Sequence, residues 1–361
     1  MSKETLIRVF FWKPLKGLFN IMIKVLIADD SLTVREKISE VLAADPELLV
    51  VGKAKDGKEA IALNESLRPH LIIMDLVMPV MDGQEATEII MAYHPTPIII
   101  HSSAANRGEA YRAMDALSAG ALTFVEKSSP DWEIELPLMV KKVARIKVIT
   151  HLKRKISLSP NKTFRFPSIS KQNNYNLLAI GASTGGPKVV QNLLSHLPDN
   201  FPLPVLLVIH CGESYQSSLI EWLNQNTKCK VRMAVNGTPL QDKEMGVFLA
   251  QPGKHLTVKN GLIRIRNDPP VNFCRPSVDV LFESIAADPT MKAIGILLTG
   301  MGKDGANGLA AIKKSNGFTI AQDEATSIVF GMPGEAIKKG AVMKILPEHK
   351  ILHEVMHLLG K

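Results

Sequence analysis

A serine in a glycine-flanked turn is the residue of this sequence best suited to covalent chemistry. The segment Gly181-Ala182-Ser183-Thr184-Gly185 directly follows an apolar run. Its spacing fits the G-x-S-x-G pattern, whose glycines let the chain turn sharply enough to lift a serine hydroxyl above a sheet edge. Because a serine hydroxyl is a weak nucleophile, the pattern predicts a hydrolase only if a base and an orienting acid lie nearby.

Two histidines and one aspartate are candidates for these partners. His210 ends the apolar run 204–210, which would put it at the same sheet edge as Ser183, so it is the preferred base. His255 is the second candidate, but we expect it to be a satisfied core histidine more than a base, and a contact with substrate stays open for it. Asp304 lies in the glycine-rich segment 299–308, where it is either the acid or simply a helix N-cap. Exposed backbone N–H groups beside those glycines can stabilise an oxyanion. We expect the other histidines, His101 among them, at helix ends or connections.

A second set of polar residues is typical of a cation site. Asp29 and Asp30 end one apolar run, Asp75 ends another, and Ser102 and Lys127 follow two more. The carboxyl ends of parallel strands converge in a doubly wound sheet. Three carboxylates in one place repel one another unless a hard cation neutralises them, and Mg²⁺ prefers such oxygen ligands. The spacing therefore predicts a Mg²⁺ site.

The elements that position both sets alternate between apolar strands and amphipathic helices, the pattern of parallel sheets covered on both faces. The fold class is therefore α/β in both halves. The expected strands are 23–28, 48–53, 70–74, 97–101 and 121–125 in the first half, and 177–182, 204–210, 230–235, 246–250, 292–299 and 318–321 in the second, with a final helix at 348–359.

The length of 361 residues exceeds what one hydrophobic core usually supports, so two domains are expected. We expect the first domain at 22–152 and the second at 177–361, with residues 153–176 as a basic linker. Residues 1–21 form an N-terminal extension that we expect to be disordered. An amphipathic surface segment is the alternative, but Met22 begins a natural first strand, which favours a disordered tail or an artefact of start-site choice.

Charge and composition exclude several classes. The net charge is +8, but residues 141–176 hold ten Lys or Arg and no acidic residue, which describes a connector better than a duplex-binding domain. Nucleic acid is therefore not an expected partner. No apolar run is long enough to cross a bilayer, so no membrane insertion is expected. Three cysteines without C-x-x-C spacing favour neither disulfides nor a zinc finger, and the expected location is the cytoplasm.

Residues 23–150 resemble a response-regulator receiver domain, which is flavodoxin-like, and Asp75-Leu76-Val77-Met78-Pro79-Val80-Met81-Asp82-Gly83 matches its phosphorylation motif. The resemblance implies that Asp75 accepts a phosphoryl group from a chemotaxis histidine kinase. Ser128 departs from the family, which usually has Pro after the lysine. The resemblance assigns Mg²⁺ to Asp29, Asp30 and Asp75, phosphate contacts to Ser102 and Lys127, and the switch aromatic to Phe124.

The second domain resembles the catalytic domain of the chemotaxis protein-glutamate methylesterases, the CheB family. The matching segments are 181–187, His210, 275–282, 299–305 and 330–333. The resemblance implies a doubly wound domain with a Ser183–His210–Asp304 triad, an oxyanion contact near Met301, and no cofactor in this domain. It also implies γ-glutamyl methyl esters on chemoreceptors as substrates, with methanol released, and glutamine deamidation in some members.

Two positions depart from this family. Cys211-Gly212 follows the histidine where Met-Pro is common, and Gly334 stands where an arginine is common. If that arginine binds acidic receptor helices, the receptor preference of this chain differs from that of its relatives.

Three other interpretations have weaker support. The segment His353-Glu354-Val355-Met356-His357 formally matches a zinc-protease helix, but no third ligand is suggested and the apolar spacing favours an amphipathic closing helix. The 181–186 loop lacks the lysine of a P-loop and the spacing of a dinucleotide fingerprint. A second domain that only binds a partner also remains open. The chain order serine, histidine, aspartate differs from that of the α/β-hydrolases.

Overall fold

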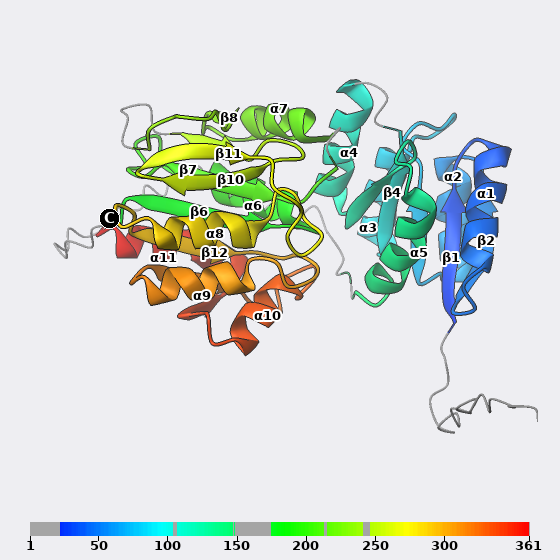
Figure 1. The fold of residues 1–361 in the computed structure, drawn as a ribbon. Coiled ribbons are helices and arrows are strands. Elements are labelled where there is room, and N and C mark those ends of the chain that lie inside the picture. Colours follow the sequence, from blue (N-terminus) through cyan, green and yellow to red (C-terminus); the bar gives the residue numbers. More distant parts are fainter. Residues whose placement is uncertain are drawn as a thin grey trace, which may run out of the picture.

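The structure is a computed structural model that describes residues 22–103, 107–146, 148, 175–212, 215–240 and 246–360. Two α/β units lie side by side (Figure 1). The expected extension at 1–21, and the expected linker apart from Tyr175 and Asn176, lie outside the described residues.

The first unit is a parallel sheet in the order β2-β1-β3-β4-β5. The chain turns back at β1, so the carboxyl ends of β1 and β3 meet at a topological switch point, where open α/β sheets bind ligands. The strands are β1 (Ile23–Ala28), β2 (Leu48–Ala54), β3 (Leu71–Met74), β4 (Ile98–Ser102) and β5 (Thr123–Glu126); the helices are α1 (Leu32–Ala43), α2 (Gly57–Leu67), α3 (Gly83–Tyr93), α4 (Arg107–Ala119) and α5 (Trp132–Val143).

The second unit has a parallel sheet in the order β14-β13-β12-β6-β7-β9-β8 and a separate β10-β11 hairpin. Its switch point lies between β6 and β12. The strands are β6 (Leu177–Ala182), β7 (Val205–Ile209), β8 (Val231–Met233), β9 (Val247–Leu249), β10 (His255–Lys259), β11 (Leu262–Arg266), β12 (Ala293–Leu297), β13 (Phe318–Gln322) and β14 (Lys344–Leu346); the helices are α6 (Gly186–Ser195), α7 (Gln216–Asn226), α8 (Val278–Ala287), α9 (Ala306–Lys314), α10 (Met332–Lys338) and α11 (Glu348–Leu358).

The expected α/β class, parallel sheets and strands are confirmed, with boundaries within about two residues of those expected. Three further strands were missed. β10 and β11 form a hairpin outside the main sheet, joined by Asn260 and Gly261 in left-handed conformations. β14 is a three-residue edge strand. His101 lies inside β4 and is 1% exposed, so its expected place in a connection was wrong.

Alternate residues of each central strand face different layers, as the pleat of a strand requires. Leu178 and Ile180 of β6 face a core that includes α6, α7 and α11, whereas Leu177 and Ala179 face α8 and α9. The first of these cores continues into the other unit, where it includes residues of α3 and α4. The two units therefore share one apolar cluster.

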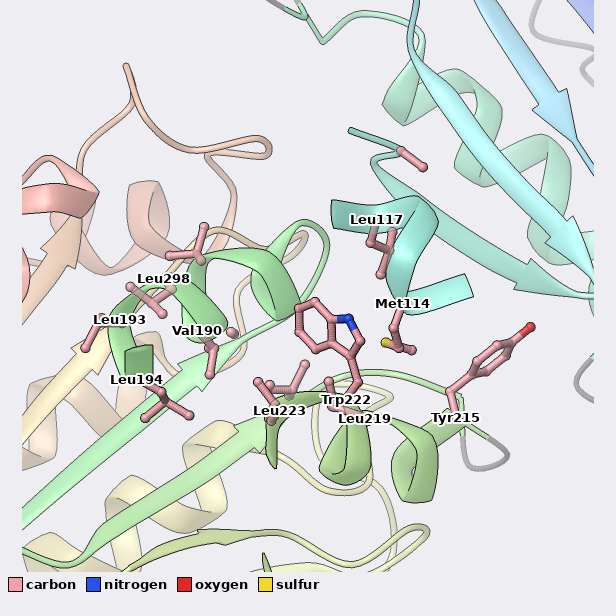
Figure 2. Close-up of a cluster of buried hydrophobic side chains, with 14 of the residues drawn as sticks. Met114, Leu117, Val190, Leu193, Leu194, Tyr215, Leu219, Trp222, Leu223 and Leu298 are labelled. Carbon is pink, nitrogen blue, oxygen red and sulfur yellow. The ribbon is translucent and has the colours of Figure 1, made fainter. Parts of the chain in front are cut away.

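Trp222 of α7 lies at the centre of this shared cluster. Figure 2 shows its indole between Val190 of α6 and two residues of α4, Met114 and Leu117. Trp222 is 1% exposed. Burying a large aromatic side chain contributes several kcal/mol of hydrophobic stabilisation, of order 25 cal/mol per Å² of apolar surface, so this contact holds the two units together.

Candidate active site and phosphorylation site

Ser183 follows β6 at the switch point of the second sheet. Its N–H donates to the carbonyl of Thr299, 3.0 Å away, which ties the serine to the end of β12. Gly185 has φ +75° and is the N-cap of α6, so the turn uses a conformation that glycine adopts without a steric penalty. A Cβ on Gly300 would lie 2.8 Å from the Cβ of Ser183, so the close approach of these two loops requires glycine there.

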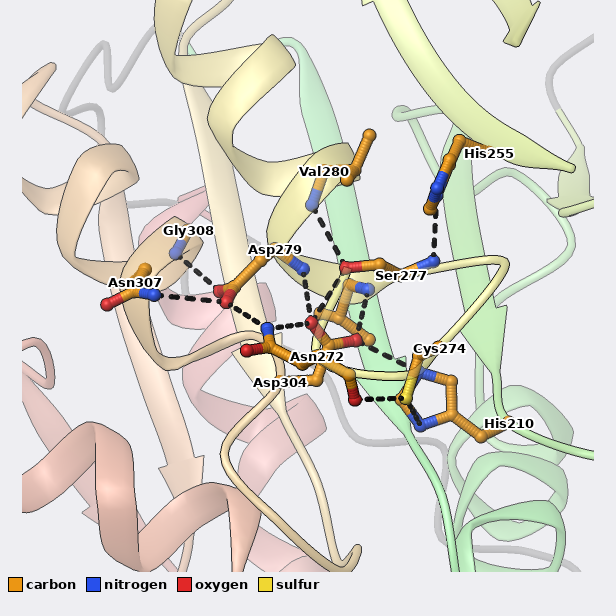
Figure 3. Close-up of polar contacts among 11 residues, drawn as sticks. His210, His255, Asn272, Cys274, Ser277, Asp279, Val280, Asp304, Asn307 and Gly308 are labelled. Atoms are coloured by element: carbon orange, nitrogen blue, oxygen red, sulfur yellow. Dashed lines mark hydrogen bonds and ion pairs between the residues drawn. The ribbon is translucent and has the colours of Figure 1, made fainter. Parts of the chain in front are cut away.

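His210 and Asp304 meet at the same edge of the sheet, as expected from the sequence. His210 follows β7, and its Nε2 lies 3.0 Å from Oδ2 of Asp304 (Figure 3). Its Nδ1 lies 3.8 Å from Sγ of Cys274. Burial alone would lower the pKa of His210, but the contacts with Asp304 and Cys274 outweigh it and raise that pKa to about 9.

Asp304 is buried at the N-termini of two helices. Its carboxylate accepts hydrogen bonds from Ser277 Oγ at 2.7 Å and from the backbone N–H of Val278 at 2.6 Å, both at the start of α8. Burial would raise the pKa of Asp304, but hydrogen bonding to His210 and to its other donors lowers it. Asp304 is therefore held ionised beside the imidazole of His210. The residue that caps α9 is Gly305, so the interpretation of Asp304 as only a helix N-cap does not hold.

Ser183, His210 and Met301 line one pocket of about 290 Å³. Among the residues that the structure describes, no hydrogen bond joins Ser183 to His210. The opposite wall of the pocket comes from the first unit, including Phe124 of β5 and Met139 of α5. The candidate active site thus lies where the two units face each other.

The remaining histidine candidates do not line this pocket. His255 is fully buried at the start of β10, where its Nδ1 accepts the N–H of Ser277 at 3.2 Å and its Nε2 lies 3.1 Å from the carbonyl of Pro269. His255 is therefore a satisfied core histidine, the role that the sequence favoured for it, and it contacts the start of α8 and not the pocket. His353 and His357 lie on the closing helix α11. Among the described residues, the groups that could hold a metal ion are His210–Cys274–Asp304 and Asp29–Asp30–Asp75, and neither includes these two histidines.

The acidic residues of the first unit also come together. Asp29, Asp30 and Asp75 present carboxylate oxygens within 4.8 Å of one another, and this set suits a hard cation such as Mg²⁺. Lys127 Nζ lies 2.7 Å from both Asp29 and Asp75. Burial, more than the nearby charge of Asp75, raises the pKa of Asp29, although Lys127 opposes it. These carboxylates therefore gain from a bound cation.

Ser102 and Phe124 connect this acidic pocket to the second unit. Ser102 ends β4, and its carbonyl accepts the N–H of Lys127 at 3.1 Å and the hydroxyl of Tyr215 at 3.4 Å. The rings of Phe124 and Tyr215 lie 3.9 Å apart between centroids. Tyr215, just before α7, is fully buried. It is thus in contact with two of the residues that the sequence placed at the phosphorylation site.

Two further contacts join α4 to α7. The Nε1 of Trp222 donates to Oδ1 of Asp115 at 3.1 Å, and the hydroxyl of Tyr111 donates to Oε1 of Gln225 at 2.6 Å. The sequence does not single out these residues or Tyr215. Their types are compatible with ordinary core or surface positions, so only the packing of the two units shows their role.

The fold and the two sites define a class of protein: a receiver-type domain joined to a parallel α/β domain that carries a serine, a histidine and an ionised aspartate around one pocket. Comparison with known proteins confirms both halves. Residues 25–136 match the response regulator receiver domain, and residues 178–355 match the CheB methylesterase domain. The chain belongs to the CheB methylesterase family, as its motifs led us to expect.

Curated relatives match over nearly the whole chain. A protein-glutamate methylesterase/protein-glutamine glutaminase 1 from Syntrophus aciditrophicus is 41% identical over 94% of this chain and 99% of its own length. A related protein from Anaeromyxobacter dehalogenans is 39% identical over 91% of this chain and 95% of its length. Among solved structures, the CheB methylesterase catalytic domain of Thermotoga maritima is 33% identical, covers 51% of this chain and 98% of its own, and has a TM-score of 0.48. None of the helices in the described ranges is long and apolar enough to span a membrane.

Proposed function

We propose that this protein hydrolyses glutamate γ-methyl esters on the cytoplasmic helices of chemoreceptors, and also deamidates receptor glutamines, under control of its receiver domain. The observation that carries the proposal is the pocket lined by both Ser183 and His210, with His210 paired to Asp304. The relatives named above act on protein glutamate esters and glutamine, and the same chemistry suits a serine with a carboxylate-backed imidazole. Its location would be the cytoplasm.

The proposed mechanism uses the serine as a covalent nucleophile. Neutral His210 takes the proton of the Ser183 hydroxyl, whose oxygen attacks the ester carbonyl. Since Nε2 faces Asp304, the serine proton would go to Nδ1, which in this structure lies 3.8 Å from Sγ of Cys274. The backbone N–H near Met301 stabilises the oxyanion. His210 then gives the proton to the leaving group, and methanol departs.

Water completes the reaction by the same route. His210 takes a proton from the water molecule, whose oxygen attacks the acyl-serine, and the proton passes to Ser183 Oγ as the acyl bond breaks. The products are a glutamate carboxylate and the free enzyme. A glutamine substrate would lose ammonia in place of methanol. Asp304 holds the imidazole and stabilises its positive charge in both steps.

Asp75 is the proposed phosphorylation site, with a chemotaxis histidine kinase as phosphodonor. Asp29, Asp30 and Asp75 would hold Mg²⁺, which neutralises charge at the acceptor carboxylate during phosphoryl transfer. Lys127 and Ser102 would contact the phosphate. Phosphorylation adds about −1.5 to −2 charges to a pocket where Lys127 now bridges Asp29 and Asp75, so this contact must rearrange.

The receiver would control access to the active site. In this structure it forms one wall of the pocket, through Phe124 and Met139, and it is held there by α7. A rearrangement at Ser102 and Phe124 would change the position of Tyr215, because Tyr215 contacts both residues. A hundredfold activation requires about 2.7 kcal/mol of differential stabilisation, which is within the usual range of allosteric coupling. We propose residues 22–152 and 177–361 as the two units, with 153–176 joining them.

The experiment is methanol release from methylated receptor membranes, with and without a small phosphodonor and Mg²⁺. We expect release that increases on phosphorylation, and an Asp75→Asn variant that stays at the basal rate in both conditions. Equal activity of this variant and wild type in the presence of phosphodonor would contradict control through Asp75. No release by the phosphorylated wild type would favour a second domain that only binds a partner.

A further inference from the structure

Asn272 lies in the segment between β11 and α8 and contacts two buried carboxylates with one side chain. Its Nδ2 donates to Oδ1 of Asp304 at 3.0 Å and to Oδ2 of Asp279 at 2.8 Å (Figure 3). A primary amide has two N–H donors, so one is available for each carboxylate. Asn272 has φ +52°, a left-handed conformation that Asn tolerates better than most residues.

The two carboxylates need such a shared donor because they are buried together. Asp304 is 2% exposed and Asp279 is 1% exposed. Burial raises the pKa of Asp279, and the charge of Asp304 raises it further, whereas hydrogen bonds from Gly308 and Asn272 lower it. A side chain at position 272 that only accepts hydrogen bonds would have no N–H to donate to the carboxylates of Asp279 and Asp304.

The main chain of Asn272 reaches the opposite side of the catalytic imidazole. Its carbonyl accepts a hydrogen bond from Sγ of Cys274 at 3.4 Å, and that sulfur lies 3.8 Å from Nδ1 of His210. Asp304 lies on the other side, beside Nε2. One residue therefore contacts the groups that face both ring nitrogens of His210.

We propose that Asn272 is a positioning residue of the esterase, whose amide holds Asp304 against His210 while its carbonyl seats Cys274 on the other side of the ring. The proposal rests on the Ser183–His210–Asp304 triad proposed above. Asn272 acts through Asp304, so it affects the rate of the chemical steps and not the binding of the receptor helix.

The first test is steady-state methanol release by phosphorylated Asn272→Ala and Asn272→Gly. Glycine adopts the left-handed backbone without strain, so Asn272→Gly removes the side-chain amide and leaves the backbone conformation accessible. If Asn272→Ala fails to fold, Asn272→Gly still tests the amide. A lost hydrogen bond to a charged group leads us to expect a decrease in kcat of roughly 10- to 100-fold, with KM within about twofold. Asn307→Ala is the matched control, because Asn307 donates to Asp279 at 3.3 Å and not to Asp304; its kcat should stay within about twofold.

A double-mutant cycle then separates positioning from general stability. If Asn272 acts through Asp304, Asn272→Gly should have little further effect on the residual activity of Asp304→Asn. An equal fractional loss in both backgrounds would overturn the proposal, as would wild-type kcat in Asn272→Gly. Failure of the triad is distinct, because Asp304→Asn would then itself retain full activity.

Discussion

Asp115 offers the sharpest test of the contact between the two units. It lies on α4 of the receiver, and its Oδ1 accepts the Nε1 hydrogen of Trp222, which is 1% exposed. In Asp115→Ala, the indole N–H of Trp222 would be buried without the Asp115 carboxylate as acceptor while the two units are docked. Once the units separate, water would hydrate the same N–H. A hydrogen bond to a charged group contributes about 1.5–3 kcal/mol, so the docked form should be destabilised by that amount relative to the open form.

This destabilisation converts into activity through the population of the open form. A shift of about 1.5–3 kcal/mol changes the ratio of open to docked molecules by roughly 10- to 150-fold. We expect the basal methanol-release rate of Asp115→Ala to rise by at least tenfold, up to the phosphorylated rate of wild type, which itself should not change. The assay is initial-rate methanol release without phosphodonor, with thermal unfolding as the check on folding.

The matched control is Asp115→Asn, which keeps a carbonyl oxygen for the indole and should stay within about threefold of the wild-type basal rate. If Asp115→Ala and Asp115→Asn both keep the wild-type basal rate while phosphorylation still activates them, the α4–α7 contact is not what restrains the active site, and the reasoning is refuted.

Three further outcomes follow from the same structure. His210 must be neutral to act as base, and its pKa is raised to about 9, so kcat/KM should rise with pH toward 9. Because Asp304 contributes to the raised pKa, Asp304→Asn should shift this rise in kcat/KM to lower pH. An unshifted pH profile would count against the pairing of His210 with Asp304. Burial, with the charge of Lys127, lowers the pKa of His101 to about 3 in the folded state. The unfolded chain binds a proton at this histidine below about pH 6.5 and the folded protein does not, so the free energy of unfolding falls as the pH drops below about 6.5. Relative to His101→Phe, wild type should lose about 2 kcal/mol of unfolding free energy between pH 7 and pH 5 by chemical denaturation, and parallel profiles would refute this. A Cβ in Gly300→Ala would lie 2.8 Å from that of Ser183, so kcat should fall about tenfold or more, whereas an unchanged kcat would show that the loop relaxes freely.

Much of the fold was predictable because strong local patterns agree with it. The run before Ser183 and the run before His210 are short, continuous apolar segments of the kind typical of a central parallel strand. Ser183, His210 and Asp304 lie together because each follows a strand of the same sheet. The acidic set of the receiver was predictable for the same reason.

The supporting residues were not predictable, because their roles depend on contacts between distant segments. Asn272 contacts Asp304 across 32 positions, and Tyr215 contacts Ser102 across 113. Neither has a local pattern that separates it from an ordinary turn or core residue. A substrate contact stayed open for His255 because its sequence context shows a preceding strand but not the loop that buries it.

The most direct test of the central claim is methanol release from methylated receptor membranes by phosphorylated Ser183→Ala beside wild type. We predict that this variant folds, accepts phosphate at Asp75, and loses several orders of magnitude in rate, with only a small residual activity. A rate within tenfold of wild type would show that Ser183 is not the nucleophile.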